Sequence, residues 1–256
     1  MHALGTIAFI AALNQETRPL LRRAGARRKG STDGFPTYRF DLFSRECLLI
    51  LSGVGVMRAM RAVHALFSVT RPQLVVSFGI AGAPQNDLCV GDVIVAHTVR
   101  SLNAAGLPGR SQDLVSLSEP ALQASAQALH TRGARFFSGI ALTTPGVQTV
   151  NLAGLSVEHP VLEMETAGIA QACSSQDIPV LAFRGVSDSV DQPLPFDLEE
   201  YLDRNQNLRA GRLLAGLVRD PSLFSRLNRL RRNAARAAEN CVAAMCAALD
   251  THLHSL

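Results

Sequence analysis

Short apolar runs alternate with helical segments along most of this chain, and that alternation limits the possible folds more than any other feature. The runs at 5–13, 73–78, 136–143 and 180–184 are short and almost wholly apolar, which is typical of strands buried on both faces. Helical periodicity lies between them and is clear over 118–132. Buried strands interleaved with helices predict an α/β fold, a three-layer α/β/α sandwich around a central mixed sheet.

Weaker patterns supply the remaining predicted elements. Further strands are predicted at 38–42, 46–51 and 92–97, and further helices at 17–23, 57–70 and 165–174. The basic, glycine-rich stretch 22–34 is predicted to be a solvated loop. Small residues at 52–55 and 79–82 are predicted to form turns where strands end.

The C-terminal part has the pattern of one long amphipathic helix. Apolar residues recur in steps of four and three at Leu223, Leu227, Leu230, Ala234, Ala237, Cys241, Ala244 and Ala248. Arginines crowd the same stretch, at Arg226, Arg229, Arg231, Arg232 and Arg236. A helix packed on the body with a solvated basic face fits this pattern, and so does one that touches an anionic membrane surface. We predict a main domain over 1–218, with 219–256 as part of the same domain.

Composition excludes several classes of protein. Hydrophobic residues make up 47% of the 256 residues and charged residues 18%, so the chain can bury a core and is neither disordered nor fibrous. The net charge is only +4, aromatic residues are 5% and Trp is absent, which disfavours a nucleic-acid binder. The five cysteines and seven histidines lack metal-binding spacing, so we expect no metal, no cofactor and reduced thiols. The apolar stretch 3–13 is too short for a membrane span and lacks signal-peptide features, which predicts a cytoplasmic protein.

Charged residues follow several predicted strands. Glu16 follows the first strand, Glu163 and Glu165 follow the apolar residues 160–162, and Arg184 and Asp188 follow the strand that begins at 180. In an open α/β sheet, ligands bind beyond the carboxyl ends of the strands. A carboxylate beside an apolar strand is costly unless it is paired or used. Each one alone fits a helix cap or a salt bridge, but together they indicate a ligand site.

The segments around these residues resemble the nucleoside phosphorylase/hydrolase superfamily, in particular its 5′-methylthioadenosine/S-adenosylhomocysteine nucleosidase branch. The resemblance is carried by LEMETAGIAQ at 162–171 and RGVSDSVD at 184–191. SGVG at 52–55, GIAG at 79–82 and VGD at 90–92 follow in the family's order. The resemblance covers about residues 5–200 and implies an enzyme that cleaves a purine N-glycosidic bond.

The resemblance also implies catalytic roles. Asp188 would protonate or hydrogen-bond purine N7, with Ser187 in support. Glu16 would deprotonate the attacking water, which Glu163 and Arg184 would help to position. Each acid or base step is typically worth about 10²–10⁴ in rate.

The implied substrate-binding residues include two neighbours on the LEMET segment: Glu165 would hold the ribose hydroxyls and Met164 would pack against the sugar. The remaining implied binding residues are Ile80, Ala81, Gly82 and Val147. Two departures stand out. Ile80 replaces a Ser or Thr of the family, and the loop at 142–150 lacks the aromatic residue that stacks on the base in the methylthioadenosine branch.

Other details resemble the hopanoid-associated phosphorylases, which are thought to remove adenine from adenosylhopane. These are LNQETR at 13–18, FGIAG at 78–82 and the arginine-rich tail after Pro221. That branch often carries Asp where this chain has Glu163. This second resemblance implies that the substrate is an adenosine with a large apolar 5′ substituent.

Hydrolysis and phosphorolysis both remain open, and so does a scaffold that only binds nucleosides, which Ile80 favours. A phosphorylase needs arginines for its phosphate dianion, and Arg18, Arg22 and Arg23 are candidates unless they face solvent. A carboxylate base at Glu16 suits water and repels phosphate, which favours hydrolysis. The resemblance further implies a homodimer or larger homo-oligomer.

Overall fold

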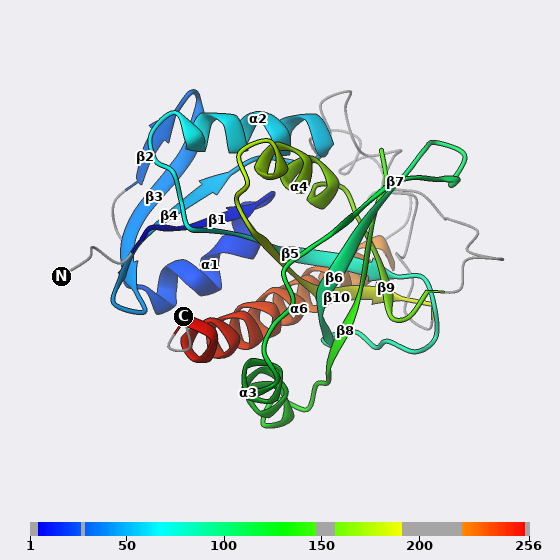
Figure 1. The fold of residues 1–256 in the computed structure, drawn as a ribbon. Helices are drawn as coiled ribbons and strands as arrows, with labels where there is room; N and C mark the ends of the chain where they lie inside the picture. Colours follow the sequence, from blue (N-terminus) through cyan, green and yellow to red (C-terminus); the bar gives the residue numbers. More distant parts are fainter. Residues whose placement is uncertain (1–4, 27–28, 147–156, 191–221, 254–256) are drawn as a thin grey trace.

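In the residues that the computed structural model describes (5–26, 29–146, 157–190 and 222–253), ten strands form one mixed sheet between two layers of helices (Figure 1). The strands in chain order are β1 (Ile7–Ala11), β2 (Lys29–Thr32), β3 (Phe35–Leu42), β4 (Arg45–Leu51), β5 (Leu74–Ala83), β6 (Val93–Leu102), β7 (Pro108–Asp113), β8 (Phe136–Thr143), β9 (Pro160–Glu163) and β10 (Val180–Ser189). The predicted α/β fold with a central mixed sheet is confirmed.

The sheet has a parallel centre. β1 lies between β4 and β5 and is parallel to both, and β5 is parallel to β10 on its other side. β10 continues antiparallel to β6, which is parallel to β8, and β8 is parallel to β9. β9 returns to β5 through the pair Gly82 and Leu162. The carboxyl ends of β1, β5, β9 and β10 are thereby brought to one region.

The helices cover the two faces of the sheet (Figure 1). α2 (Val56–Phe67) and α4 (Thr166–Ser174) lie on one face. α1 (Asn14–Arg23), α3 (Glu119–His130) and α6 (Ser222–Leu253) lie on the other. Alternate side chains of a strand point to opposite faces, so Ile10 joins the core under α2 and α4 while Phe9 joins the core under α6. This double burial explains the uniformly apolar strand sequences.

Three predictions about local structure are wrong, each because of a tertiary pairing. GIAG at 79–82 is not a turn but part of β5, and 184–188 does not follow a strand but belongs to β10. The two strands support each other as far as Ala83 and Ser189, with a β-bulge between Val186 and Asp188. The stretch 22–34 is not only a loop, because β2 pairs with β3 there.

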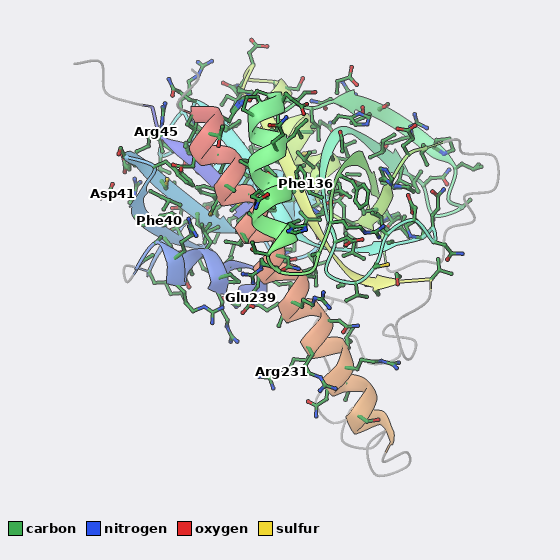
Figure 2. The ribbon with its side chains drawn as sticks, turned by 90° about the horizontal axis from the view of Figure 1, so that it is seen from below. Phe40, Asp41, Arg45, Phe136, Arg231 and Glu239 are labelled. Atoms are coloured by element: carbon green, nitrogen blue, oxygen red, sulfur yellow. The ribbon has the colours of Figure 1, made fainter. Side chains whose placement is uncertain are left out.

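The C-terminal helix α6 packs its predicted apolar stripe against the body from Ala234 onward, and Ala237, Cys241, Ala244 and Ala248 are fully buried. Figure 2 shows the end that carries Arg231 extending away from the body. The side chain of Leu223 and the proposed domain limit at 218 lie outside the described residues. Among the helices described here, none is long and apolar enough to cross a membrane.

Candidate active site

Residues that lie in or just after five strands line one pocket. β1 leads into α1, which carries Glu16, while β10 contributes Arg184 and the segment before α4 contributes Glu165. The complete lining is Ile10, Ala11, Ala12, Glu16, Ser52, Ser77, Phe78, Gly79, Glu165, Ile169 and Arg184. The buried Glu16 and Arg184 and the half-buried Glu165 thus converge on one pocket, which agrees with the predicted proximity of these residues.

Glu16 is held by backbone amides on both sides of its carboxylate. It lies in the first turn of α1, and its Oε2 accepts hydrogen bonds from the N–H groups of Leu13 (2.7 Å) and Ala12 (3.0 Å). Its Oε1 accepts from the N–H of Ile80 on β5 (3.0 Å). The residue is 4% exposed, and this burial raises the pKa of the carboxyl group although the three amides oppose the shift. Glu16 is therefore fixed in place and binds a proton more readily than an ordinary glutamate.

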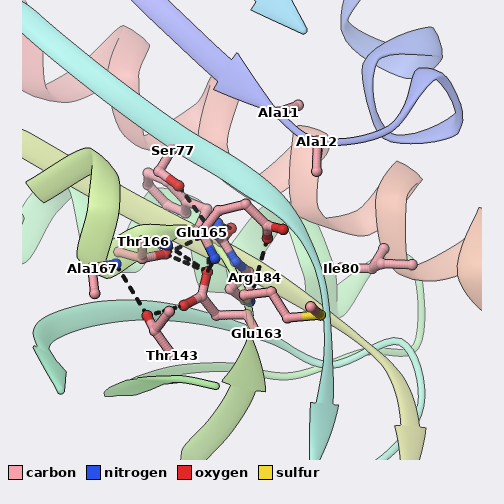
Figure 3. A network of polar contacts seen from close by, with 12 residues as sticks. Ala11, Ala12, Ser77, Ile80, Thr143, Glu163, Glu165, Thr166, Ala167 and Arg184 are labelled. Atoms are coloured by element: carbon pink, nitrogen blue, oxygen red, sulfur yellow. Dashed lines mark hydrogen bonds and ion pairs between the residues drawn. The ribbon is translucent and has the colours of Figure 1, made fainter. Parts of the chain in front are cut away.

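Glu163 is the anion of a buried ion pair (Figure 3). Its Oε2 accepts from Arg184 Nη2 (2.8 Å), Thr166 Oγ1 (2.6 Å) and the N–H of Thr166 (2.8 Å), while its Oε1 accepts from Thr143 Oγ1. Burial alone would disfavour the charged form. The positive charge of Arg184 and the hydroxyl donors of Thr143 and Thr166 outweigh burial and lower the pKa of Glu163. Glu163 is thus a charged anchor for Arg184.

Glu165 lies two residues after Glu163, and its pKa is shifted in the opposite direction. Its Oε1 accepts from the N–H of Gly55 at 2.9 Å, just before α2 begins. Gly55 has φ +105°, a conformation that side chains rarely adopt. Burial and the nearby charge of Glu163 raise the pKa of Glu165 to about 8. At neutral pH its carboxyl group is mostly protonated and can donate a hydrogen bond to a hydroxyl group.

Arg184 connects the carboxylates to the sheet. Its Nη2 donates to Ser77 Oγ on β5 (2.9 Å) as well as to Glu163 and Thr166, and its Nη1 donates to the carbonyl of Phe183 (2.8 Å). Figure 3 shows Ser77, Thr166 and Glu163 arranged around this guanidinium. With its side chain 3% exposed and these groups in place, Arg184 presents a fixed positive charge at the pocket.

Ser187 is the extra residue of the bulge in β10, and Asp188 follows it. Ser187 Oγ donates to Asp188 Oδ1 at 2.7 Å. Burial raises the pKa of Asp188, and the Ser187 hydroxyl only partly offsets this. Asp188 also lies against Gly82, where an added Cβ would come within 2.6 Å of Oδ2. A partly buried carboxyl group with a raised pKa suits the role of a general acid.

The structure places the other predicted residues as follows. Ile80 contributes its backbone N–H to Glu16, and its side chain lies apart from the Arg184 network (Figure 3). Ala81 is buried and its carbonyl accepts from Ser187 Oγ at 3.3 Å, while Met164 is half-buried beside Glu165. Val147 lies outside the described residues. The candidate phosphate ligands Arg18, Arg22 and Arg23 are exposed.

Sequence reasoning missed the hydroxyl residues that complete the network: Ser77, Thr143 and Thr166. Each is at least 97% buried. The available signal was a polar residue inside or directly after an apolar segment, because a buried hydroxyl group needs a hydrogen-bonding partner. Within the described part of the chain, no cluster of His, Cys, Asp and Glu is arranged to hold a metal ion.

This chain is similar in sequence to known nucleosidases. The chain is 27% identical over 212 residues to a 5′-methylthioadenosine/S-adenosylhomocysteine nucleosidase from Glaesserella parasuis, a match covering 77% of this chain and 91% of the relative. A Bacillus thuringiensis nucleosidase of the same name is 24% identical over 213 residues, which cover 77% of this chain and 92% of that protein.

Solved structures share the fold. The Neisseria meningitidis nucleosidase of that name, in complex with methylthio-immucillin-A, superposes with a TM-score of 0.69 at 20% identity, over 97% of this chain and all of the other. Futalosine hydrolase of Helicobacter pylori gives 0.68 at 15% identity, over 98% and 100% of the two chains. The sequence pattern of the phosphorylase superfamily matches residues 6–219, and this chain therefore belongs to that superfamily.

Proposed function

We propose that this protein hydrolyses the N-glycosidic bond of a 5′-substituted adenosine and releases adenine. The observation that carries the proposal is the pocket shared by Glu16, Glu165 and Arg184, with Asp188 further along the same pair of strands. The relatives named above are nucleosidases for 5′-methylthioadenosine and S-adenosylhomocysteine, which supports this substrate class.

Two carboxyl groups divide the acid and base work. Glu16 lies against Gly79 and Asp188 lies against Gly82, three residues further along β5. The two glycines are three residues, about 10 Å, apart along the strand, so β5 separates the candidate base from the candidate acid. Both groups have a raised pKa, which brings each closer to the pH at which an acid–base catalyst works best.

The proposed step is a displacement at C1′ of the ribose. Protonated Asp188 gives its proton to N7 of the purine, the bond between C1′ and N9 breaks, and the bonding electrons leave with adenine. A water oxygen bonds to C1′ and gives its proton to Glu16. The products are neutral adenine and a free 5′-substituted ribose, and the two carboxyl groups exchange protons with solvent before the next turnover.

The remaining residues bind and position the substrate. Glu165, protonated at neutral pH, donates a hydrogen bond to a ribose hydroxyl, and Met164 packs against the sugar. Arg184 orients the water, and Glu163 holds Arg184 in place through its 2.8 Å ion pair. Water is favoured over phosphate as the nucleophile, because the candidate phosphate-binding arginines are exposed and Arg184 is already paired with Glu163.

The test is adenine release from a panel of 5′-substituted adenosines, with and without phosphate. The panel holds methylthioadenosine, S-adenosylhomocysteine and a 5′-alkyl adenosine that mimics a lipid substituent such as that of adenosylhopane. Release without phosphate that is lost in Glu16→Gln and Asp188→Asn supports hydrolysis, and relative rates rank the 5′ substituents. Strict dependence on phosphate, with a ribose-1-phosphate product, overturns it in favour of phosphorolysis. No release from any member overturns it in favour of a nucleoside-binding scaffold.

The proposal includes a homo-oligomer, which the family resemblance implies, and a cytoplasmic location, which the N-terminal sequence predicts. Sedimentation of the purified full chain measures its mass, and a species of 27.4 kDa would contradict this part of the proposal. Contact of α6 with a membrane also stays a prediction, for which binding to anionic vesicles is the measurement.

A further inference from the structure

We propose that Asn240 of α6 is a positioning residue for the general acid Asp188, acting through Gly91 and Asp92. The inference rests on the proposed function, because it concerns the same acid. Asn240 is 2% exposed, which is unusual for a polar side chain on a helix that packs against a sheet. Both the nitrogen and the oxygen of its side-chain amide form hydrogen bonds within the protein.

The side chain of Asn240 joins two separate segments. Its Nδ2 donates a 2.7 Å hydrogen bond to the carbonyl of Gly91, and its Oδ1 accepts a 2.7 Å hydrogen bond from Arg132 Nε, just after α3. The second contact orients the amide so that its donor faces Gly91. The helix therefore holds the backbone at Gly91 in one position.

The segment at Gly91 in turn holds the strand that carries the acid. The N–H of Gly91 donates to the carbonyl of Val186 at 2.8 Å, and the N–H of Val186 donates to the carbonyl of Asp92 at 2.8 Å. Val186 begins the β-bulge of β10, and Ser187 and Asp188 follow at once. A bulge interrupts the regular ladder of a strand and re-aims the next side chain, so bonds at Val186 govern where Asp188 points.

Other contacts fix the two ends of this connection. The side chain of Asp92 accepts from the N–H of Cys89 (2.9 Å), from the N–H of Arg135 (2.9 Å) and from Arg135 Nε (3.0 Å). Gly185 packs directly on the backbone of α6, since a Cβ added there would lie 2.2 Å from the carbonyl oxygen of Ala237. Because α6 and Asp92 are both held in place, the hydrogen bond from Asn240 to Gly91 fixes the bulge relative to the helix.

The test compares the affinity of the full-length protein for adenine and for 7-deazaadenine, which lacks the N7 that Asp188 is proposed to contact. Calorimetric titration measures both dissociation constants. We expect the wild-type protein to prefer adenine by about tenfold or more, the contribution of one hydrogen bond to a charged or strongly polar group. Asn240→Asp keeps an acceptor for Arg132 but sets a carboxylate against the Gly91 carbonyl, and its preference for adenine should fall to about twofold or less.

Matched variants separate positioning from general stability. Ser125 is fully buried in α3 and its Oγ lies 3.1 Å from the α6 carbonyl of Ala244, so Ser125→Ala disturbs the packing of α6 without touching Gly91. Ser125→Ala should therefore keep the wild-type preference. Arg132→Met removes the contact that orients the Asn240 amide, so it should lower the preference for adenine, although less than Asn240→Asp does. If Asn240→Asp fails to fold, Asn240→Ala supplies the same comparison.

The outcomes are distinct. An Asn240 variant that keeps the full preference for adenine overturns the positioning role. A loss of the preference in Ser125→Ala as well overturns it too, because the effect is then one of packing. A wild-type protein with no preference for adenine overturns the proposed contact between Asp188 and N7, and with it the proposed function.

Discussion

Gly79 lies directly against the carboxylate of Glu16: a Cβ added at residue 79 would be 2.6 Å from Oε1 and 3.0 Å from Cδ. Glu16 has no free direction in which to move, because its Oε2 is bound by the amides of Ala12 and Leu13 and its Oε1 by the amide of Ile80. Because Gly79 has no side chain, β5 can pass close to the carboxylate of the candidate base Glu16.

Gly79→Ala should accordingly impair the base while leaving the sheet intact. The methyl group displaces the Glu16 carboxylate, so we expect kcat for adenine release to fall by about 10²-fold, the lower end of what a general base contributes. Circular dichroism checks that the fold is kept. Gly30→Ala on the edge strand β2 is the control, since its Cβ meets the Thr37 hydroxyl at 3.1 Å and the Thr37 carbonyl oxygen at 4.0 Å. Unchanged kcat in Gly79→Ala would contradict the role of Glu16.

The strand pattern of the sequence was sufficient to predict that several candidate site residues lie close together. Apolar runs predicted β1, β8 and the first halves of β5 and β10, because strands covered by helices on both faces are apolar. Carboxyl ends of neighbouring parallel strands meet at one edge, so Glu16 and Arg184 were expected to lie close together, and they line one pocket.

What the sequence could not predict depends on pairings between distant segments. β5 continues through Gly79 and Gly82 only because β10 lies beside it, and local composition there favours a turn. β7 has no apolar alternation, since it is a mostly exposed edge strand paired only with β6, and it was not predicted. Asn240 contacts Gly91 across 149 positions of the sequence, a separation at which no local pattern carries information.

Gly185 gives a prediction about stability. Its neighbour is the backbone of α6, so an added methyl group 2.2 Å from the carbonyl oxygen of Ala237 forces the helix away from the sheet. We expect Gly185→Ala to lower the free energy of unfolding by about 1–3 kcal/mol, the usual cost of overpacking. Urea denaturation measures it. Gly109→Ala is the control, because its Cβ meets a movable Ser101 hydroxyl at 2.9 Å; equal losses in the two variants would count against tight packing at Gly185.

The pair of Glu163 and Arg184 should show strong coupling in a double-mutant cycle. Their side chains are 0% and 3% exposed and 2.8 Å apart. Removing one partner, as in Arg184→Met, leaves a buried charge unpaired and should cost about 3–5 kcal/mol of unfolding free energy. Adding Glu163→Gln should recover part of that loss. The exposed pair of Arg39 and Glu46, also 2.8 Å apart, is the control and should show coupling below about 1 kcal/mol.

Additive losses for the buried pair would contradict this prediction. Additivity is the usual behaviour of groups that do not interact. It would mean that Thr143 and Thr166 satisfy Glu163 without help from Arg184, although Thr166 Oγ1 lies 2.6 Å from the guanidinium as well.

Glu165 predicts how stability depends on pH. The pKa of its carboxyl group is about 8 in the folded protein, whereas an unfolded glutamate titrates near its ordinary value of about 4.3. Between these values the folded chain holds a proton that the unfolded chain releases. The stabilisation is fully present below about pH 4 and is lost as pH rises through about 8, so the free energy of unfolding falls over this range.

Glu165→Gln carries a neutral side chain of similar shape at every pH and should remove this contribution. The free energy of unfolding, measured by urea denaturation between about pH 5 and pH 8, should therefore fall less steeply in the variant than in the wild-type protein. The difference in unfolding free energy between the variant and the wild-type protein should grow toward pH 8. Glu46→Gln removes an exposed carboxylate of β4 and should leave the slope unchanged. Parallel curves for Glu165→Gln and the wild-type protein would show that Glu165 is ionised throughout the range, and a charged Glu165 could not donate a hydrogen bond to the ribose.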